Sequence, residues 1–391
     1  MRLRRQRAVL AGMTATALLF AACSSDTGGG ASNAMDPSSS KPGSGSSARA
    51  VYPADEWSTV DATEAGFDQA ALDTLAAEAE AAGSTCLVVT RDGEVVDQRY
   101  WQGATSETTR QAFSVTKSLT STAVGIAQDE GDLDISDPAS EYLTEWQGTA
   151  SESVTIKDLL SNDSGREWSL TIDYTEMAVA APDKTAFALA LGQDEPPGEV
   201  WAYNNSAIQT LSPLVERATG ERLDDYAQKR LLDKIGMADS EWDSDSAGNP
   251  LAFMGLQTTC LDLARFGYLA LHDGNWDGDQ VVSADFVKQA TGGPSTPLNA
   301  AYGYLWWLNH EGNVASPAVA TEARTDGSSS ADQLVPGVPQ DVFWALGFQS
   351  QIVAVLPDDG IVAVRMGDAP AADARFGETE LTTGVLAAFT G

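Results

Sequence analysis

Ser114 and Lys117 stand three residues apart in the segment FSVTKSLTSTAVGIAQ, which has the pattern of a helix. At this spacing both side chains lie on one face of a helix, one turn from each other. A serine hydroxyl is a weak nucleophile and needs a neighbouring base. A lysine amine can be that base if burial or a nearby cation lowers its pKa. The pair predicts a nucleophile beside its general base, although S-x-x-K alone is a weak signal because it occurs often by chance.

A second pair of polar residues, Tyr203 and Asn205, lies in PPGEVWAYNNSAIQTL at the predicted start of another helix. A tyrosine hydroxyl can give a proton to a leaving group, and an asparagine amide can hold both a lysine and a substrate. Two structural roles remain open beside these. Tyr203 would pack in the core at a helix start, and Asn205 would cap the helix.

Other catalytic chemistries find little support in the sequence. The chain has only two histidines, His272 and His310, and no G-x-S-x-G motif surrounds a candidate serine. A triad of serine, histidine and acid is therefore not expected. A zinc site is not expected either, because histidine and cysteine do not occur at ligand spacing. We expect no cofactor.

Composition excludes two classes of partner. The chain has 391 residues and 43% hydrophobic content, enough for a large core, and a net charge of −33. So acidic a chain is not suited to nucleic acid or to anionic membranes through its surface charge. A small-molecule substrate is the expected partner, and the oligomeric state is left open.

The N-terminal segment has the pattern of an export signal. A basic region with four arginines precedes an apolar run, residues 8–22, and the run ends in FAAC at Cys23. This segment resembles a bacterial lipoprotein signal, with Phe20 where leucine is usual. The resemblance implies cleavage after residue 22, lipidation of Cys23 and attachment to the outer face of the cell membrane. Without lipidation the protein would be secreted or periplasmic. The Gly/Ser-rich residues 23–52 would form a flexible tether before a folded domain at 53–391.

Two further cysteines, Cys86 and Cys260, lie within the predicted folded domain. In an exported protein an isolated pair of cysteines favours a disulfide. Two buried reduced thiols are the alternative, because the sequence does not reveal their separation.

The predicted secondary structure is mixed. Residues 68–83 have a helical pattern, and a hairpin turning at Asp92-Gly93 follows. Helical patterns fill the middle of the chain, and strands return in YGYLWWLN, VFWALGF, QIVAVLP and GIVAVRMG before a last helix near 378–389. This order predicts an α+β fold: an antiparallel sheet built from both termini, flanked by helices, with an inserted helical lobe at about 130–300.

Together these motifs resemble the serine beta-lactamase-related family, which includes class C beta-lactamases, DD-peptidases, esterases and 6-aminohexanoate-dimer hydrolases. FSVTK resembles the nucleophile motif of the family and YNN its Y-x-N motif. GDLDISDP, IKDLLSNDSG, PPGEVWAYNNSA, GLQTTCLDLARFGYLAL and AYGYLWWLN resemble further landmarks in family order. The resemblance covers roughly residues 55–391 and implies the beta-lactamase/transpeptidase-like fold.

The resemblance also implies a role for each motif residue. Ser114 would be the acylated nucleophile, and Lys117 would take its proton. Tyr203 would relay a proton to the leaving group, and Asn205 would orient Lys117 and the substrate. The backbone amides of Ser114 and Phe348 would form the oxyanion hole.

The sequence departs from the family in the third motif, a strand that usually carries Lys-Thr-Gly or His-x-Gly. Here ALG occupies these positions, and we expect Ala345, Gly347 and the nearby Gln349 to contact substrate. The family's cation binds the carboxylate of penicillins, so Ala345 in its place favours esters or small linear amides. SNDSG also departs, with Asn162 and Asp163 where relatives carry His and Thr. The alternatives are a beta-lactamase, a DD-peptidase, or a non-catalytic cell-envelope binding protein of the same fold.

Overall fold

A six-stranded antiparallel sheet is the scaffold of the protein, in a computed structural model that describes residues 51–322, 332–371 and 374–391. The sheet order is β2-β1-β13-β12-β11-β9. Its strands are β1 (Ser84–Arg91), β2 (Glu94–Tyr100), β9 (Trp307–Leu308), β11 (Phe343–Gly347), β12 (Gln351–Leu356) and β13 (Ile361–Gly367). An N-terminal hairpin thus pairs with a C-terminal meander. This arrangement confirms the predicted α+β class and the sheet built from both termini.

Helices cover both faces of this sheet. The helices α1 (Gln69–Ala81) and α11 (Glu378–Ala388) pack on one face, where Trp344 of β11 donates its indole N–H to Thr382 at 2.9 Å. The helix α9 (Cys260–Leu271) packs on the other face, where Gly267 approaches the side chains of Val362 and Val353. The side chains of β12 and β13 are buried because helices cover both faces.

A disulfide joins Cys86 of β1 to Cys260, the first residue of α9. The bridge spans 174 residues of chain and ties the sheet to this helix. The helix α9 falls inside the range predicted for the inserted lobe, residues 130–300. It nevertheless belongs to the cover of the sheet, because its apolar face and the disulfide hold it against β1, β12 and β13.

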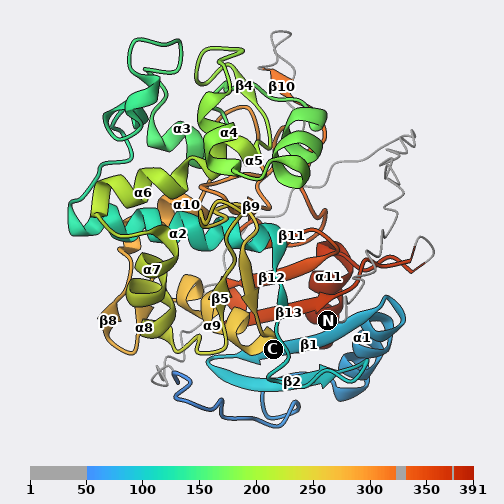
Figure 1. The fold of residues 1–391 in the computed structure, drawn as a ribbon. Helices are drawn as coiled ribbons and strands as arrows, with labels where there is room; N and C mark the ends of the chain where they lie inside the picture. The colour runs from blue at the N-terminus through green and yellow to red at the C-terminus, as the bar shows by residue number, and fades with distance from the viewer. Residues whose placement is uncertain (1–50, 323–331, 372–373) are drawn as a thin grey trace, which may run out of the picture. The chain divides into compact units, whose positions relative to one another are not determined.

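The helical region lies beyond α2 (Thr116–Glu130), whose residues from Thr116 to Ala127 are all buried. Figure 1 shows α3, α4, α5 and α6 gathered on one side of α2, with the strands β1, β2, β12 and β13 of the sheet on the other. The helices of this region are α3 (Ile156–Ser161), η4 (Thr171–Ala180), α4 (Lys184–Ala190), α5 (Asn205–Gln209), α6 (Leu211–Thr219), α7 (Leu223–Ala227), η5 (Gln228–Leu232), α8 (Asp233–Ile235) and α10 (Ala284–Thr291). The buried helix α2 therefore lies between the two halves of the domain.

Several short elements complete the surroundings of α2. The turn η1 (Phe113–Val115) precedes it, and β3 (Arg110–Gln111), β6 (Leu256–Thr258) and β5 (Glu241–Trp242) form a small sheet beside that turn. A further ladder pairs β4 (Val200–Trp201) with β10 (Thr321–Glu322). The strand predicted for YGYLWWLN is mostly absent, since only β9 pairs there. Leu305 has a left-handed φ of 60°, which interrupts an extended chain.

The predicted signal peptide, the lipidation site Cys23 and most of the tether lie outside the described residues. The chain from Arg49 to Gly391 forms one compact unit. Among the residues described, none of the helices combines the length and apolar character needed to cross a bilayer.

Candidate active site

Ser114 lies in η1, the single helical turn that leads into α2. The preceding Phe113 has a left-handed φ of 49°, which is unfavourable for a residue with a Cβ. Two hydrogen bonds with Leu256 of β6 hold the turn: the Ala112 amide donates to its carbonyl at 2.8 Å, and Thr116 Oγ1 accepts from its amide at 3.0 Å. The small sheet thus fixes the backbone that carries the serine.

Lys117 is buried beside Ser114, with 2.8 Å between Nζ and the serine Oγ. The amine also donates to the carbonyl of Phe253 at 2.9 Å and lies 4.8 Å from the ring centre of Tyr203. Within the described chain it forms no ion pair. Burial lowers the pKa of Lys117 to about 7, and the charge of Asp173 opposes this shift. A large fraction of the amine is therefore neutral near pH 7, as a general base requires.

Tyr203 is buried in a group of aromatic rings that includes Trp201, Tyr302 and Trp307. The Lys117 amine lies over its ring and Ser114 influences the pKa of its phenol, so the structure brings Ser114, Lys117 and Tyr203 together. Burial raises the pKa of Tyr203 well above its usual value, which keeps the phenol protonated. Tyr203 thus has the core packing that the sequence offered as its structural role, and its position beside Lys117 is also compatible with proton transfer to a leaving group.

Asn205 begins α5 but is held by an acid. Its side-chain amide donates to Asp173 Oδ2 at 2.7 Å, and its backbone amide donates to the same oxygen at 3.2 Å. Asp173 Oδ1 accepts from the amide and the hydroxyl of Ser206, both at 2.8 Å. The cap of α5 is Asn204, whose Oδ1 accepts from the Ala207 amide. The hydrogen bonds of Asn205 therefore orient it toward Asp173, and no hydrogen bond to Lys117 appears in the described chain.

Asp173 is completely buried on η4, and its carboxylate raises the pKa of Lys117 against the effect of burial. Burial raises the pKa of Asp173, and the hydrogen bonds from Ser206 and Asn205 oppose the rise. For the next residue, Tyr174, burial raises the pKa to about 12 although 40% of the residue is exposed, and Asn205 opposes this rise. The helix η4 thus supplies an acid and a phenol that support the start of α5.

Asn162, one of the two residues in SNDSG that depart from the family, also supports the Tyr203–Asn205 segment. Asn162 has a left-handed φ of 60° at the end of α3. Its Oδ1 accepts from the Asn204 amide at 3.3 Å, and its Nδ2 donates to the hydroxyl of Tyr302 at 3.0 Å. Asp163 is buried, and burial raises its pKa to about 7. Asn162 therefore links α3 to the Tyr203–Asn205 segment, whereas Asp163 makes no contact with Ser114 or Lys117 that the structure shows.

The third motif meets the nucleophile turn through its backbone. A Cβ on Gly347 would lie 2.3 Å from the carbonyl oxygen of Ala112 and 3.3 Å from the amide of Ser114, so only glycine fits. The ring of Phe348 packs edge-on against Phe113 at 5.6 Å. Ala345 has no exposed surface, so its methyl group offers nothing for a substrate to contact in this conformation. Gln349 is partly buried, and its carbonyl is bound by other side chains.

A cavity of about 190 Å³ lies next to the Tyr203–Asn205 segment, with Trp168 in its wall. The Trp168 indole N–H donates to the carbonyl of Tyr203 at 3.1 Å. Three exposed carboxylates also line the cavity: Asp194, Glu195 and Glu322. Among the described residues, the one basic group in the wall is Arg166, which is buried and donates to Ser151 and the Ala188 carbonyl. The charge of this cavity favours neutral or cationic groups over anions.

The histidines lie away from the nucleophile. His272 ends α9 and packs against the rings of Tyr52 and Tyr268, and His310 follows β9. The described residues contain no group of three or more His, Cys, Asp or Glu side chains arranged to hold a metal ion.

Comparison with known proteins decides the family. A model of the family described as Beta-lactamase matches residues 69–380 of this chain. The chain belongs to the beta-lactamase family. The match covers most of the domain and includes every motif residue considered above.

The individual relatives share less than 30% of their sequence with this chain. The chain is 28% identical over 263 residues to a 6-aminohexanoate-dimer hydrolase of Paenarthrobacter ureafaciens, covering 58% of this chain and 65% of that one, slightly under two thirds of the relative's length. It is 27% identical over 140 residues to a beta-lactamase of Pseudomonas fluorescens, covering 35% and 37% of the two chains. A solved beta-lactamase structure from Mycobacterium bovis shares the fold, with a TM-score of 0.59, 18% identity and coverage of 82% and 100%.

Sequence reasoning missed the residues that support the motifs. Asp173 and Tyr174 lie on η4, for which no helix was predicted, and about 30 residues of chain separate them from Tyr203. The segment WSLTIDYTEMAV mixes polar and apolar residues without a clear period, so Asp173 is indistinguishable from a surface acid. The carbonyl of Phe253, which accepts from Lys117, has no signature in a sequence.

Proposed function

We propose that the protein hydrolyses carboxylic esters or small linear amides through a covalent acyl-enzyme on Ser114. The observation that carries this proposal is the 2.8 Å contact between Ser114 Oγ and the buried amine of Lys117. At neutral pH the buried lysine is in part unprotonated. In that state the hydrogen bond runs from the serine hydroxyl to the amine, which is the geometry for proton abstraction.

In acylation, neutral Lys117 takes the Ser114 proton while Oγ attacks the substrate carbonyl carbon. The carbonyl oxygen becomes an oxyanion, and the amides of Ser114 and Phe348 are the proposed donors to it. The oxyanion then collapses and breaks the bond to the alkoxide or amine leaving group. Tyr203, protonated and close to Ser114 and Lys117, gives its proton to the leaving group and regains one from the ammonium of Lys117.

Deacylation runs the same proton path in reverse. A water molecule replaces the leaving group and gives its proton to the base formed by Lys117 and Tyr203. Its oxygen attacks the acyl carbonyl, and Ser114 leaves with a proton returned from Lys117. The contacts of Asn205 with Asp173 and Tyr174 keep the segment that carries Tyr203 in place during both steps.

Two features favour uncharged substrates over carboxylated lactams. Ala345 stands where relatives have a cation and is itself buried. Arg365 lies on β13, two strands from β11 in the sheet, and all of its donors are bound to protein oxygen atoms. Arg365 is therefore not free to bind a substrate carboxylate, and the one cation in the described wall of the nearby cavity, Arg166, is buried and donates to Ser151 and Ala188.

Export and anchoring belong to the same proposal. The basic and apolar residues before Cys23 favour secretion as a lipoprotein, and the Gly/Ser-rich tether would hold the hydrolase domain clear of the membrane. We expect the full-length protein to be extracted into detergent and Cys23→Ser to lose this property.

A fluorophosphonate probe tests the chemistry. It is expected to label wild-type protein at Ser114 and to leave Ser114→Ala unlabelled with an unchanged melting temperature. Turnover of an uncharged aryl ester, a linear amide dimer and nitrocefin then ranks the substrates. Absence of labelling would favour a binding protein of the same fold. A higher kcat/KM for nitrocefin than for the ester would overturn the substrate assignment.

A further inference from the structure

Arg365 is a fully buried arginine on the central strand β13, and each of its N–H groups has an acceptor. The acceptors are Ser84 Oγ at 2.8 Å and the carbonyls of Gln349 at 2.6 Å, Ser350 at 3.0 Å, Ala82 at 3.3 Å and Asp368 at 2.8 Å. Four of these five acceptors are backbone carbonyls. The guanidinium thus connects the end of α1, the start of β1 and the turn between β11 and β12.

This guanidinium has no carboxylate partner. The side chain of Asp368 pairs with Arg110 instead, and Arg365 forms no ion pair within the described chain. Burial lowers the pKa of Arg365 to about 10, so the group stays charged at neutral pH. A buried charge without a counter-ion is costly and calls for a specific role of its hydrogen bonds.

The turn that Arg365 binds is strained. Gly347 of β11 pairs with Gln351 of β12, so three residues connect the strands. Two of them, Gln349 with φ of 64° and Ser350 with φ of 58°, adopt left-handed conformations that are unfavourable for residues with a Cβ. Neither position holds the glycine or asparagine that such turns prefer. Contacts from outside the turn must therefore hold this conformation.

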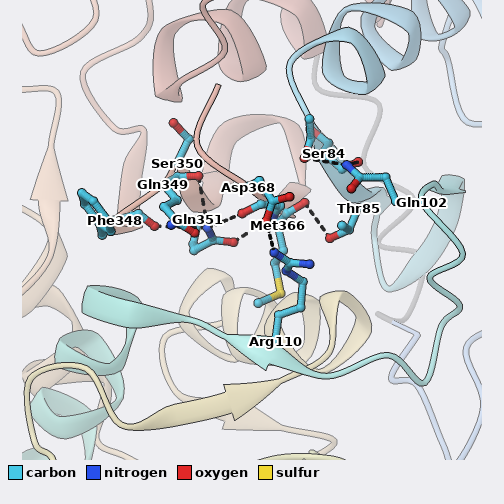
Figure 2. A network of polar contacts seen from close by, with 12 residues as sticks. Ser84, Thr85, Gln102, Arg110, Phe348, Gln349, Ser350, Gln351, Met366 and Asp368 are labelled. Atoms are coloured by element: carbon cyan, nitrogen blue, oxygen red, sulfur yellow. Dashed lines mark hydrogen bonds and ion pairs between the residues drawn. The ribbon is translucent and has the colours of Figure 1, made fainter. Parts of the chain in front are cut away.

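Gln351 supplies the remaining contacts. Its side-chain amide donates to the carbonyls of Phe348 at 3.1 Å, Gln349 at 3.1 Å and Gly367 at 2.8 Å, and its Oε1 accepts from the Gly367 amide at 3.0 Å. Figure 2 shows Phe348, Gln349 and Gln351 close together beside Asp368. Gln351 and Arg365 together bind every carbonyl of the turn, from Phe348 to Ser350.

The first residues of this turn lie next to the nucleophile in space. Gly347 is in van der Waals contact with the backbone around Ser114, and the ring of Phe348 packs on Phe113. The amide of Phe348 is the second donor of the proposed oxyanion hole. Its direction depends on the peptide between Gly347 and Phe348, and therefore on the conformation of the turn that follows.

We propose that Arg365, acting through the carbonyls of Gln349 and Ser350 and together with Gln351, is a positioning residue for the oxyanion hole. It holds the turn so that the Phe348 amide stays aimed at the substrate oxygen beside Ser114. This inference rests on the proposed acyl-enzyme mechanism and adds to it a residue that never touches the substrate.

Arg365→Lys tests the proposal, because lysine keeps the charge but has three donors and no planar fork. Arg265→Lys is the matched control. Arg265 is also buried, and its guanidinium donates to the carbonyls of Pro53, Ala54, Asp55 and Ile235. Both changes are expected to lower the melting temperature. With an uncharged aryl ester, Arg365→Lys is expected to lower kcat about 10- to 100-fold with KM within about threefold, since loss of one oxyanion donor costs about 10²- to 10³-fold. Arg265→Lys is expected to keep kcat within about twofold.

An arylboronic acid gives a readout that general destabilisation does not move. Ser114 Oγ adds to its boron, the serine proton passes to Lys117, and one boronate oxygen takes the place of the oxyanion. The inhibition constant is expected to rise about 10- to 100-fold in Arg365→Lys, in step with the loss of kcat/KM, and to stay unchanged in Arg265→Lys.

Wild-type kcat and boronate affinity in folded Arg365→Lys would overturn the inference, and so would equal losses in Arg265→Lys. If Arg365→Lys does not fold, Gln351→Met decides in the same assays, because it removes the contacts to Phe348 and Gln349 without changing charge. Parallel losses of kcat and boronate affinity support the proposal, and wild-type values refute it. A wild-type protein that neither turns over the ester nor reacts with a fluorophosphonate would refute the proposed function instead.

Discussion

Lys117, at the nucleophile, and Arg365, at the turn after the oxyanion strand, are two buried basic side chains with different surroundings. Lys117 has an acceptor in Phe253, a hydroxyl partner in Ser114 and two aromatic rings nearby. Arg365 has five oxygen acceptors, four of them backbone carbonyls. Neither cation forms an ion pair in the described chain. Burial lowers the pKa of Lys117 to about 7 but that of Arg365 only to about 10.

The difference shows how one domain uses buried charge for two purposes. A lysine with few acceptors loses its proton at low cost, because its charged form gains little from the site. An arginine with a full set of acceptors stays charged and orders the backbone that it binds. The poorly solvated cation suits chemistry, and the well-solvated one suits positioning. Changes at each site should therefore have distinct effects.

The largest effect is expected at Lys117. Lys117→Arg keeps a cation that stays charged in proteins, and Lys117→Ala removes it. Both are expected to lower kcat for an aryl ester by at least about 10⁴-fold, because nucleophile and base act as one unit. Single-turnover acylation measures the loss, with thermal melting as the control for folding. Near wild-type turnover in Lys117→Arg would show that the lysine is not the base.

Breaking the disulfide between Cys86 and Cys260 separates stability from positioning. The chain-entropy model assigns up to about 5 kcal/mol to a loop of this length. We expect Cys86→Ala/Cys260→Ala to lower the melting temperature strongly, because β1 and α9 lose their covalent link. The kcat of the folded fraction at low temperature should stay within about twofold. A fall in kcat similar to that of Arg365→Lys would mean that the bridge also positions the oxyanion strand.

Asp173 allows the pKa of Lys117 to be changed without touching it. Wild-type kcat/KM should rise with pH through an apparent pKa near 7, since the neutral amine is the active form. Asp173→Asn removes the negative charge that favours the protonated lysine, so this limb should move to lower pH. We expect the plateau to fall about 10- to 100-fold, because one acceptor oxygen is replaced by an amide nitrogen and two hydrogen bonds at the start of α5 are lost. A full pH–rate profile measures both effects, and a lower plateau with an unmoved limb would assign Asp173 a purely structural role.

The smallest effect is expected at Asp163, a buried acid whose pKa burial shifts as it shifts those of the two basic residues, but in the opposite direction. Burial raises its folded pKa to about 7 from an unfolded value near 4, so the folded state binds the proton more tightly. The stability gained from this proton is complete below pH 4 and is lost as pH rises through about 7. Asp163→Asn should remove that loss, so its free energy of unfolding should exceed that of the wild type by about 1–3 kcal/mol between pH 5 and 8. Melting curves across this range decide it, and parallel pH profiles for the two proteins would contradict the assignment.

Much of the fold was predictable because local patterns and global topology agree. The hairpin turning at Asp92-Gly93, the helix before it and the two C-terminal strands were all expected close to their observed bounds. Continuous apolar runs such as QIVAVL predict strands buried on both faces, and helices on both faces of the sheet bury them. YGYLWWLN was wrong as a full strand because Gly303 and Leu305 turn the chain there.

In the candidate site, too, the local features were predictable from the sequence and the long-range contacts were not. Spacing alone places Ser114 and Lys117 on one helical face, and the structure has their polar atoms 2.8 Å apart. Long-range contacts carry no such local signature. Three contacts form only after folding: Asn205 with Asp173, Lys117 with the Phe253 carbonyl, and Arg365 with its carbonyl acceptors. Residue types and spacing are properties of the chain and indicate which reaction is available. The pKa of a lysine and the direction of an amide depend on burial and on acceptors supplied by distant segments, so they exist only in the folded domain.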